Sequence, residues 1–388
     1  VVIGGAKPFY EPYFGLTGAG QAWRAGWAMR SALAGCLAGA LRSGALSDRF
    51  GRKRLLVGSA VLFTVSAVWT ALALTYDAFI WARILGGVGI GLASNVSPMY
   101  IAESSPAEMR GRFVSINQLT IVVGVLAAQL VNLLIYRVAP VAEGALPDVI
   151  LASWNGQLGW RWMFAAEAVP AALFLLLSLA IPESPRWLLK RGRAAAAERV
   201  LARIGGAGYA AAEVADVEAT LQGEHGTVGY GELLRPRLLK LVALGVFLAV
   251  FQQWCGINVI FNYAEEIFRA AGYDVSGMMF NVVITGVVNL AFTWVAIRTV
   301  DRWGRRPLML LGAGGLFVTY ALLGACYALK LQGPVVLLMV LTAIAFVSSV
   351  SRPICRKVNS SDAAISANFV GCCFDLGTWA SIRFSVSR

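Results

Sequence analysis

The sequence has few of the groups that build metal centres or disulfide frameworks. It contains one histidine, His225, and its six cysteines show no C-x-x-C spacing. We therefore expect neither a His-rich metal site nor a disulfide scaffold, and no cofactor. Charged residues make up only 14% of the 388 residues, which is low for a soluble domain. Nothing in this composition predicts an enzyme.

Apolar residues, by contrast, are abundant. They account for 58% of the chain, and the mean hydropathy is +0.68, which indicates a multi-span helical membrane protein. The stretches long enough to cross about 30 Å of hydrocarbon as a helix are 26–46, 55–75, 79–101, 113–136, 160–181, 238–261, 277–298, 308–329 and 334–350. The expected fold class is all-α, with the lipid bilayer as the main solvent.

Positive charge alternates between the connections. The formal net charge is +12, and most Lys and Arg residues lie in every second connection instead of on one basic face. By the positive-inside rule, the segments 47–54, 103–112, 182–237 and 299–307 are cytoplasmic. The charge therefore indicates topology in a multi-pass cell membrane protein, and no nucleic-acid partner is expected.

The longest connection divides the chain. Residues 182–237 are polar, and 194–204 and 210–222 are each expected to form a short helix, separated by Gly205 and Gly206. We predict an N-terminal transmembrane bundle at 1–181, a cytoplasmic helical linker domain at 182–237, an incomplete C-terminal bundle at 238–350, and a divergent tail at 351–388.

An internal repeat supports two related halves. DRFGRK at 48–53 and DRWGRR at 301–306 occupy matching places between spans. Each segment must turn on its glycine, and its carboxylate and guanidinium groups can pair across helix ends as a conformational latch. The alternative is topology charge with snorkelling side chains. Two copies at matching positions favour the latch.

Seven segments resemble the sugar porter family of the major facilitator superfamily. They are GALSDRFGRKRLL (44–56), GLASNVSPMYIAESSPAEMRGR (91–112), NQLTIVVG (117–124), GWRWMF (159–164), PESPRWLL (182–189), FQQWCGINVIFNYAEEIF (251–268) and VVNLAFTWVAIRTVDRWGRRPL (287–308). The resemblance implies a major facilitator fold of two pseudo-symmetric helical bundles around a central sugar site, with alternating access. The resemblance fails from about Phe346 onward, so we expect the chain to lack the last helices. Residues 1–11 resemble only the outer end of the first helix, so we expect most of helix 1 to be missing as well.

Amides inside the apolar spans are candidate sugar ligands. Gln118 and Gln129 are eleven residues apart, close to one helix face, and Asn132 lies near the same stripe. Such a stripe can face a cavity or hold helices together, and spacing alone leaves both open. The resemblance assigns sugar binding to Gln118, Gln252, Gln253, Asn258 and Asn289. It assigns an outer gate to Asn262 and Tyr263.

Two charges inside the spans need an explanation. Arg83 and Glu167 lie in apolar surroundings, where ionisable groups are rare and often functional. In proton-coupled members of the resembled family, the residue matching Arg83 pairs with an Asp on the first helix, and here that position would precede Val1. We assign Arg83 and Glu167 to proton coupling. The glycine run at 86–91 lies within a span and follows no strand, so we expect helix packing there and no nucleotide.

The resemblance also implies a charged network on the cytoplasmic side, with ordinary surface ion pairs as the alternative. Its members are Asp48, Arg49, Arg52, Glu103, Arg110, Glu183, Arg186, Asp301, Arg302, Arg305 and Arg306.

The functional reading is secondary transport of a monosaccharide, a hexose or pentose, together with a proton. A facilitated-diffusion uniporter, a non-transporting sugar sensor and a truncated, inactive remnant are the alternatives. The amide set favours a neutral polyhydroxyl substrate over a charged one. We expect the protein to act as a monomer.

Overall fold

We describe a computed structural model of the chain at residues 2–106, 109–142, 146–223, 263–303, 305–329 and 334–350, with single positions between 239 and 256. Every element in these ranges is helical. The first half contains α1 (Val2–Tyr13), η1 (Ala19–Gln21), α2 (Ala22–Phe50), α3 (Arg52–Leu72), α4 (Tyr76–Ser104), α5 (Arg110–Val138), α6 (Pro147–Ala152), η2 (Asn155–Gly159), α7 (Trp160–Ala165) and α8 (Ala168–Ala180).

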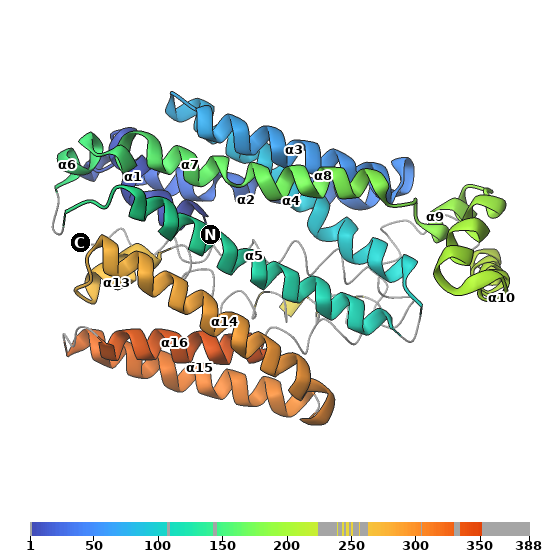
Figure 1. Cartoon of the computed structure of the whole chain (residues 1–388). Helices are drawn as coiled ribbons and strands as arrows, with labels where there is room; N and C mark the ends of the chain where they lie inside the picture. The colour runs from blue at the N-terminus through green and yellow to red at the C-terminus, as the bar shows by residue number, and fades with distance from the viewer. Residues whose placement is uncertain are drawn as a thin grey trace.

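The remaining helices belong to the linker and the second half. They are α9 (Pro185–Lys190), α10 (Ala194–Gly223), α13 (Ala264–Ala270), α14 (Val275–Trp303), α15 (Arg305–Ala328) and α16 (Pro334–Val350). Figure 1 shows the long helices running in nearly the same direction, with α14–α16 on one side and α9 and α10 apart at one end. The helices α5 and α14 pack along each other, and this contact joins the two halves. The predicted domain boundaries remain predictions.

Most of the predicted spans correspond to helices. Those long and apolar enough to cross a membrane are Arg52–Leu72, Tyr76–Ser104, Ile116–Val138, Asn155–Ala180, Val275–Thr299 and Leu310–Ala328, and Pro334–Val347 is a shorter apolar helix. The predicted span 26–46 lies within α2, which is long enough but is not among these six. Most of the predicted span 238–261, and the whole tail 351–388, lie outside the described residues.

Two expected details differ in the structure, and a third is confirmed. The segment 47–54 consists of two helix ends joined by a very short turn instead of a loop, since α2 ends at Phe50 and α3 begins at Arg52. In 299–307, α14 continues to Trp303 and α15 begins at Arg305. The predicted span 160–181 is interrupted between α7 and α8, because Pro170 has no N–H to donate to the Ala166 carbonyl. The break expected at Gly205 and Gly206 is confirmed as a kink at Gly206 inside α10.

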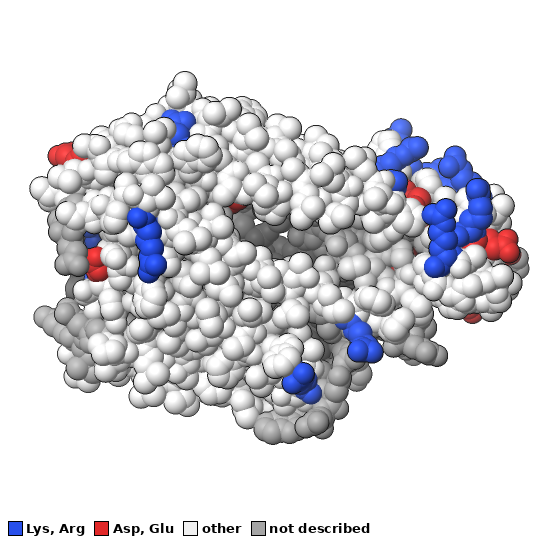
Figure 2. Space-filling view, viewed as in Figure 1, with Lys and Arg blue, Asp and Glu red and all other residues white. Residues whose placement is uncertain are grey.

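Charge is distributed as the hydropathy pattern requires. Figure 2 shows Lys and Arg side chains gathered around α9 and α10, whereas the visible face of the long helices carries only scattered charged side chains. The same view shows a hollow between α8 and α5. A lipid-facing surface must be apolar because the hydrocarbon cannot solvate charge.

The glycine run at 86–91 brings α4 against α2. A Cβ on Gly87 would lie 2.0 Å from the carbonyl oxygen of Ala32, and one on Gly91 would lie 2.1 Å from that of Cys36. Asn95 continues the contact by donating to Ser43 Oγ at 2.8 Å. The prediction of close helix packing is confirmed here. Small residues let two backbones approach where membrane helices have little hydrophobic drive to associate.

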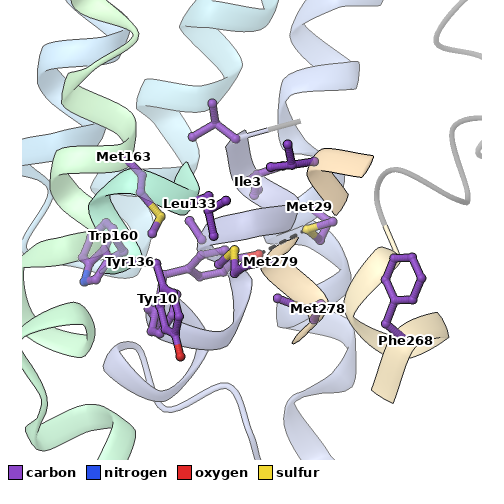
Figure 3. Close-up of a cluster of buried hydrophobic side chains, with 14 of the residues drawn as sticks. Ile3, Tyr10, Met29, Leu133, Tyr136, Trp160, Met163, Phe268, Met278 and Met279 are labelled. Atoms are coloured by element: carbon purple, nitrogen blue, oxygen red, sulfur yellow. Dashed lines mark hydrogen bonds between the residues drawn. The ribbon is translucent and has the colours of Figure 1, made fainter. Parts of the chain in front are cut away.

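A buried cluster joins α1 to helices of both halves. In Figure 3, Tyr10 of α1 lies among Tyr136 and Trp160, and Met278 of α14 packs in the same cluster. The Tyr10 hydroxyl donates to the sulfur of Met29 on α2 at 3.2 Å. This cluster places α1 between the two halves.

Replacing Gly87 by Ala is expected to destabilise the α2–α4 pair by about 1–3 kcal/mol, because the added methyl group overlaps backbone atoms of α2. The measurement is the thermal midpoint of the detergent-solubilised protein, read as loss of its folded elution peak. Gly58→Ala on α3 is the matched control, since a Cβ there meets nothing within 4 Å. Equal midpoints for the two variants would contradict this packing.

Candidate functional site

Arg83 and Glu167 line one cavity between α1, α2, α3, α4 and α8. The cavity has a volume of about 410 Å³, and its wall includes Ser66, Thr70 and Pro170. Glu167 lies at the interruption between α7 and α8, and it lines the cavity. The two residues assigned to proton coupling thus lie at one site.

The guanidinium of Arg83 has aromatic neighbours as well as a carboxylate. Its central carbon lies 5.9 Å from the ring centre of Phe79 and 5.7 Å from that of Phe164. Among the described residues, Arg83 Nε is buried without a hydrogen-bond partner, and Arg83 and Glu167 form no direct salt bridge. The cavity therefore holds a guanidinium and a carboxyl group that are close enough to interact electrostatically but are not joined by a direct salt bridge.

The amide stripe on α5 divides into different environments. Gln118 is half-buried. Asn132 is buried and donates to the Val2 carbonyl at 3.2 Å, so this residue acts as a bond between α5 and α1. Gln129 packs against α14, where a Cβ on Gly286 would lie 1.9 Å from Gln129 Oε1. Of the two roles that spacing left open for this stripe, Asn132 has the one that holds helices together.

Asn289 lies on α14 and is buried. Thr285, one turn earlier, is also buried and donates to the carbonyl of Val282 at 2.6 Å. The predicted ligands and gate residue Gln252, Gln253, Asn258 and Asn262 lie outside the described residues. The sugar-binding roles of all these amides remain predictions.

Tyr263 lies immediately before α13 and contacts the first half of the chain. Its hydroxyl accepts a hydrogen bond from Arg30 Nη2 at 2.9 Å, and Lys7 Nζ lies 5.9 Å from its ring centre. Sequence reasoning missed Arg30 and Lys7. The available signal was a cation at a position expected inside a membrane helix, namely Lys7 in the remnant of the first helix and Arg30 in the predicted span 26–46.

The charged network of the first half is centred on Arg52. Its guanidinium donates twice to Glu103, from Nε and from Nη2, each at 2.9 Å, and Nη1 lies 3.2 Å from Asp48 Oδ1. The side chains of Arg52 and Glu103 are 8% and 11% exposed, whereas that of Asp48 is 55% exposed. Burial and the bidentate geometry make Arg52–Glu103 the stronger pair.

Glu183 acts as a remote cap for α3. Its Oε1 accepts from the backbone N–H groups of Arg52 at 2.8 Å and Lys53 at 2.9 Å, which are unpaired donors of the first helical turn. A Cβ on Gly51 would lie 2.3 Å from Glu183 Oε2, and Gly51 has a φ of +96°. Glycine is therefore required at this turn both for the backbone conformation and for the approach of the carboxylate.

Further contacts attach α9 to this network. Ser184 Oγ donates to Glu103, and Trp187 Nε1 donates to the Asp48 carbonyl at 3.0 Å. Arg191 donates to the carbonyls of Asp48 and Arg49 at 3.1 and 2.8 Å. These bonds couple the linker to the α2–α3 turn, and sequence reasoning missed Ser184, Trp187 and Arg191.

Other predicted network residues are less fully described. Arg186 lies on α9 and makes a polar or electrostatic contact. The remaining ones are placed by their backbone alone, at the start of α5 and around the turn between α14 and α15, namely Arg110, Asp301, Arg302, Arg305 and Arg306. Whether the second half builds the same network remains a prediction.

Comparisons with known proteins point to one family. The sequence model of the family described as "Sugar (and other) transporter" matches residues 4–361, so the match extends past Phe346, where we expected the resemblance to fail. The chain is 39% identical over 348 residues to the D-xylose-proton symporter of Escherichia coli strain K12, covering 85% of this chain and 68% of the relative. It is 34% identical over 348 residues to the arabinose-proton symporter of Bacillus subtilis strain 168, covering 90% and 71%.

A solved structure shows the same fold. The major facilitator superfamily proton:xylose symporter XylE bound to 6-bromo-6-deoxy-D-glucose superimposes with a TM-score of 0.80 at 35% sequence identity. The superposition covers 97% of this chain and 82% of that chain. The all-α major facilitator fold expected from the sequence is thereby confirmed.

Replacing Arg52 by Lys is expected to destabilise the protein by about 1–2 kcal/mol, because an ammonium cannot reproduce the bidentate contact with Glu103. Thermal unfolding in detergent measures the change. The control is Arg54→Lys, at an exposed position one residue beyond Lys53. A double variant with Glu103→Gln should show strong coupling to Arg52→Lys, and additive effects would contradict the importance of this pair.

Proposed function

Because the chain belongs to the sugar porter family of the major facilitator superfamily, we propose that it transports a monosaccharide together with a proton through the membrane. The observation that carries the proposal is the cavity shared by Arg83 and Glu167, in a chain whose matched relatives are named as sugar-proton symporters. An ionisable carboxyl group inside the bundle is suited to binding and releasing a proton.

The sugar is proposed to bind between the two halves of the molecule. Gln118 of α5 and Asn289 of α14 belong to helices that pack along each other across the two halves. Amides at this depth can form hydrogen bonds with the sugar hydroxyls, which replace the hydrogen bonds that the sugar made with water. Gln252, Gln253 and Asn258 complete the proposed ligand set.

Proton coupling is proposed to act through the electrostatics of the cavity. When Glu167 is charged, it neutralises the positive charge of the Arg83 guanidinium, and the attraction between the two groups draws the helices that line the cavity together. When Glu167 takes up a proton, Arg83 loses this compensation and favours a different arrangement of α4 against α7 and α8. A ligand or proton shifts such an equilibrium by its differential affinity for the two arrangements.

The chain is proposed to lie in the cell membrane with its arginine-rich turns and α9 and α10 in the cytoplasm, acting as a monomeric transporter rather than an enzyme. The grouping of positive charge at this end supports that orientation. A uniporter would use the same sugar site without the protonation step. A sensor or an inactive remnant would show no uptake.

Glu167→Gln is expected to abolish sugar accumulation driven by a pH gradient, because the amide keeps the shape of the side chain but cannot carry the proton. Exchange of labelled sugar without a gradient should continue. Uptake of xylose, arabinose, glucose and galactose into proteoliposomes, with and without the gradient, tests the function and identifies the sugar. Asp77→Asn, at an exposed acid in the first turn of α4, is the control. Gradient-driven accumulation by Glu167→Gln at the wild-type level would contradict proton coupling through this residue.

Gln118→Ala is expected to weaken sugar binding about tenfold, since a lost hydrogen bond to a buried sugar hydroxyl corresponds to roughly 1–2 kcal/mol. Tryptophan fluorescence titration with the transported sugar measures the dissociation constant. Thr120→Ala is the matched control, because Thr120 lies on the same helix, is exposed, and donates only to its own helix at Ile116. Unchanged affinity in Gln118→Ala would remove Gln118 from the site.

A further inference from the structure

Lys7 places a buried positive charge in the centre of α1. The residue is 9% exposed, and its neighbours Ala6 and Phe9 are fully buried. A lysine in such surroundings must be compensated by nearby carboxylates, because an isolated charge is poorly tolerated in an apolar bundle. The position of Lys7 therefore depends on the acids that face it.

Two carboxylates compensate Lys7, and they belong to different halves of the protein. Glu11 lies one turn later on α1, with 3.9 Å between Lys7 Nζ and Glu11 Oε1. Glu266 lies on α13 and forms both a hydrogen bond and an ion pair with Lys7. The side chain of Glu11 is 16% exposed and that of Glu266 is 46% exposed.

A second cation of the first half holds the same segment. Arg30 on α2 donates to the hydroxyl of Tyr263, immediately before α13, and the Tyr263 ring faces Lys7. Phe268 of α13 packs in the hydrophobic cluster that contains Met29 of α2 and Met278 of α14 (Figure 3). Polar and apolar contacts thus bind α13 to α1 and α2 in this structure.

The geometry lets Lys7 exchange partners without becoming unpaired. If α13 moves away from α1, the contact with Glu266 is lost because the two residues belong to different halves. Glu11 moves with Lys7, because both lie on α1 one helical turn apart. Lys7 can therefore remain paired with Glu11 when the halves separate, and this pairing reduces the free-energy difference between the closed and open arrangements.

We infer that Lys7 is a positioning residue of the transport cycle. Its ion pair with Glu266 holds α13 closed over the site, and Lys7 pairs with Glu11 alone when α13 opens. The inference rests on the proposed transport function and on the orientation that makes this side the outer one. The gating segment around Tyr263 is thereby controlled by an ion-pair exchange, with Glu266 favouring closure and Glu11 favouring opening.

Single variants of the two acids test the exchange because they should act in opposite directions. Glu266→Gln and Lys7→Gln are expected to speed hydrogen exchange of the α13 backbone amides about fivefold or more, since the closed state loses its ion pair. Glu11→Gln is expected to slow the same exchange, because the open state loses its compensation. Arg24→Gln is the control, since Arg24 is an exposed cation that stacks on Tyr76.

The exchange measurement requires no sugar, so it separates this inference from the proposed function. If the wild-type protein moves no sugar but the acids show opposite effects on α13, the transport proposal fails and the ion-pair exchange stands. If both acid variants change exchange in the same direction, or neither differs from Arg24→Gln, the inference is overturned.

Transport kinetics provide the second readout. Lys7→Gln and Glu266→Gln should lower kcat for uptake about fivefold or more while leaving KM for outside sugar unchanged or lower, because the outward-open state is favoured. The charge-swapped double variant Lys7→Glu with Glu266→Lys should restore the slow hydrogen exchange of α13, since the ion pair between α1 and α13 is formed again. It should not restore the uptake rate, because α1 then carries two carboxylates and no cation to pair with them when α13 opens. Exchange of α13 in the swap as fast as in the faster single variant would contradict a direct ion pair.

Discussion

A charged side chain inside an apolar bundle has to keep a partner, and in a transporter it has to do so while the bundle changes shape. Water cannot compensate the charge at this depth, so each ionisable group constrains the helices around it. In the described part of the chain, Arg52, Arg83 and Lys7 meet this constraint in different ways. The arrangement of helix ends, cavity and gate follows from how these three cations are paired.

Each pairing has a different rigidity. Arg52 is held by the fixed two-bond contact with Glu103, and Glu183 holds the adjoining helix start through backbone N–H groups. Arg83 shares a cavity with Glu167 but is not locked to it. Lys7 has one carboxylate on its own helix and one on α13. The rigid Arg52–Glu103 pair organises the turn between α2 and α3. The Arg83–Glu167 pair, which has no direct contact, can respond to a proton. Lys7, with a carboxylate on each side, can stay paired while α13 moves.

The close packing of α2 against α4 explains why these pairs can remain in register. Gly87 and Gly91 bring the two backbones into direct contact, so α4 carries Arg83 and Glu103 on a helix that is held along its length. Rigid supporting helices are what position functional groups within a site. Charged residues such as Arg30 and Arg42 make α2 less apolar than its neighbours. Hydropathy alone therefore undervalues a helix whose small residues hold it against α4.

Local patterns in the sequence determined the helical class, most of the spans, the kink at Gly206 and the glycine contact between helices. These features depend on interactions within a few residues or on the composition of a single segment.

The amide stripe shows where that reasoning ends, because periodicity places Gln118, Gln129 and Asn132 near one face but does not say what faces them. Only the tertiary structure shows that Asn132 bonds to α1 and that Gln129 packs against Gly286. Likewise, Glu183 caps a helix that begins 131 residues earlier, and Lys7 meets Glu266 across a separation of 259 residues. Partners so distant in sequence are chosen by how the helices pack, and no local pattern contains that information.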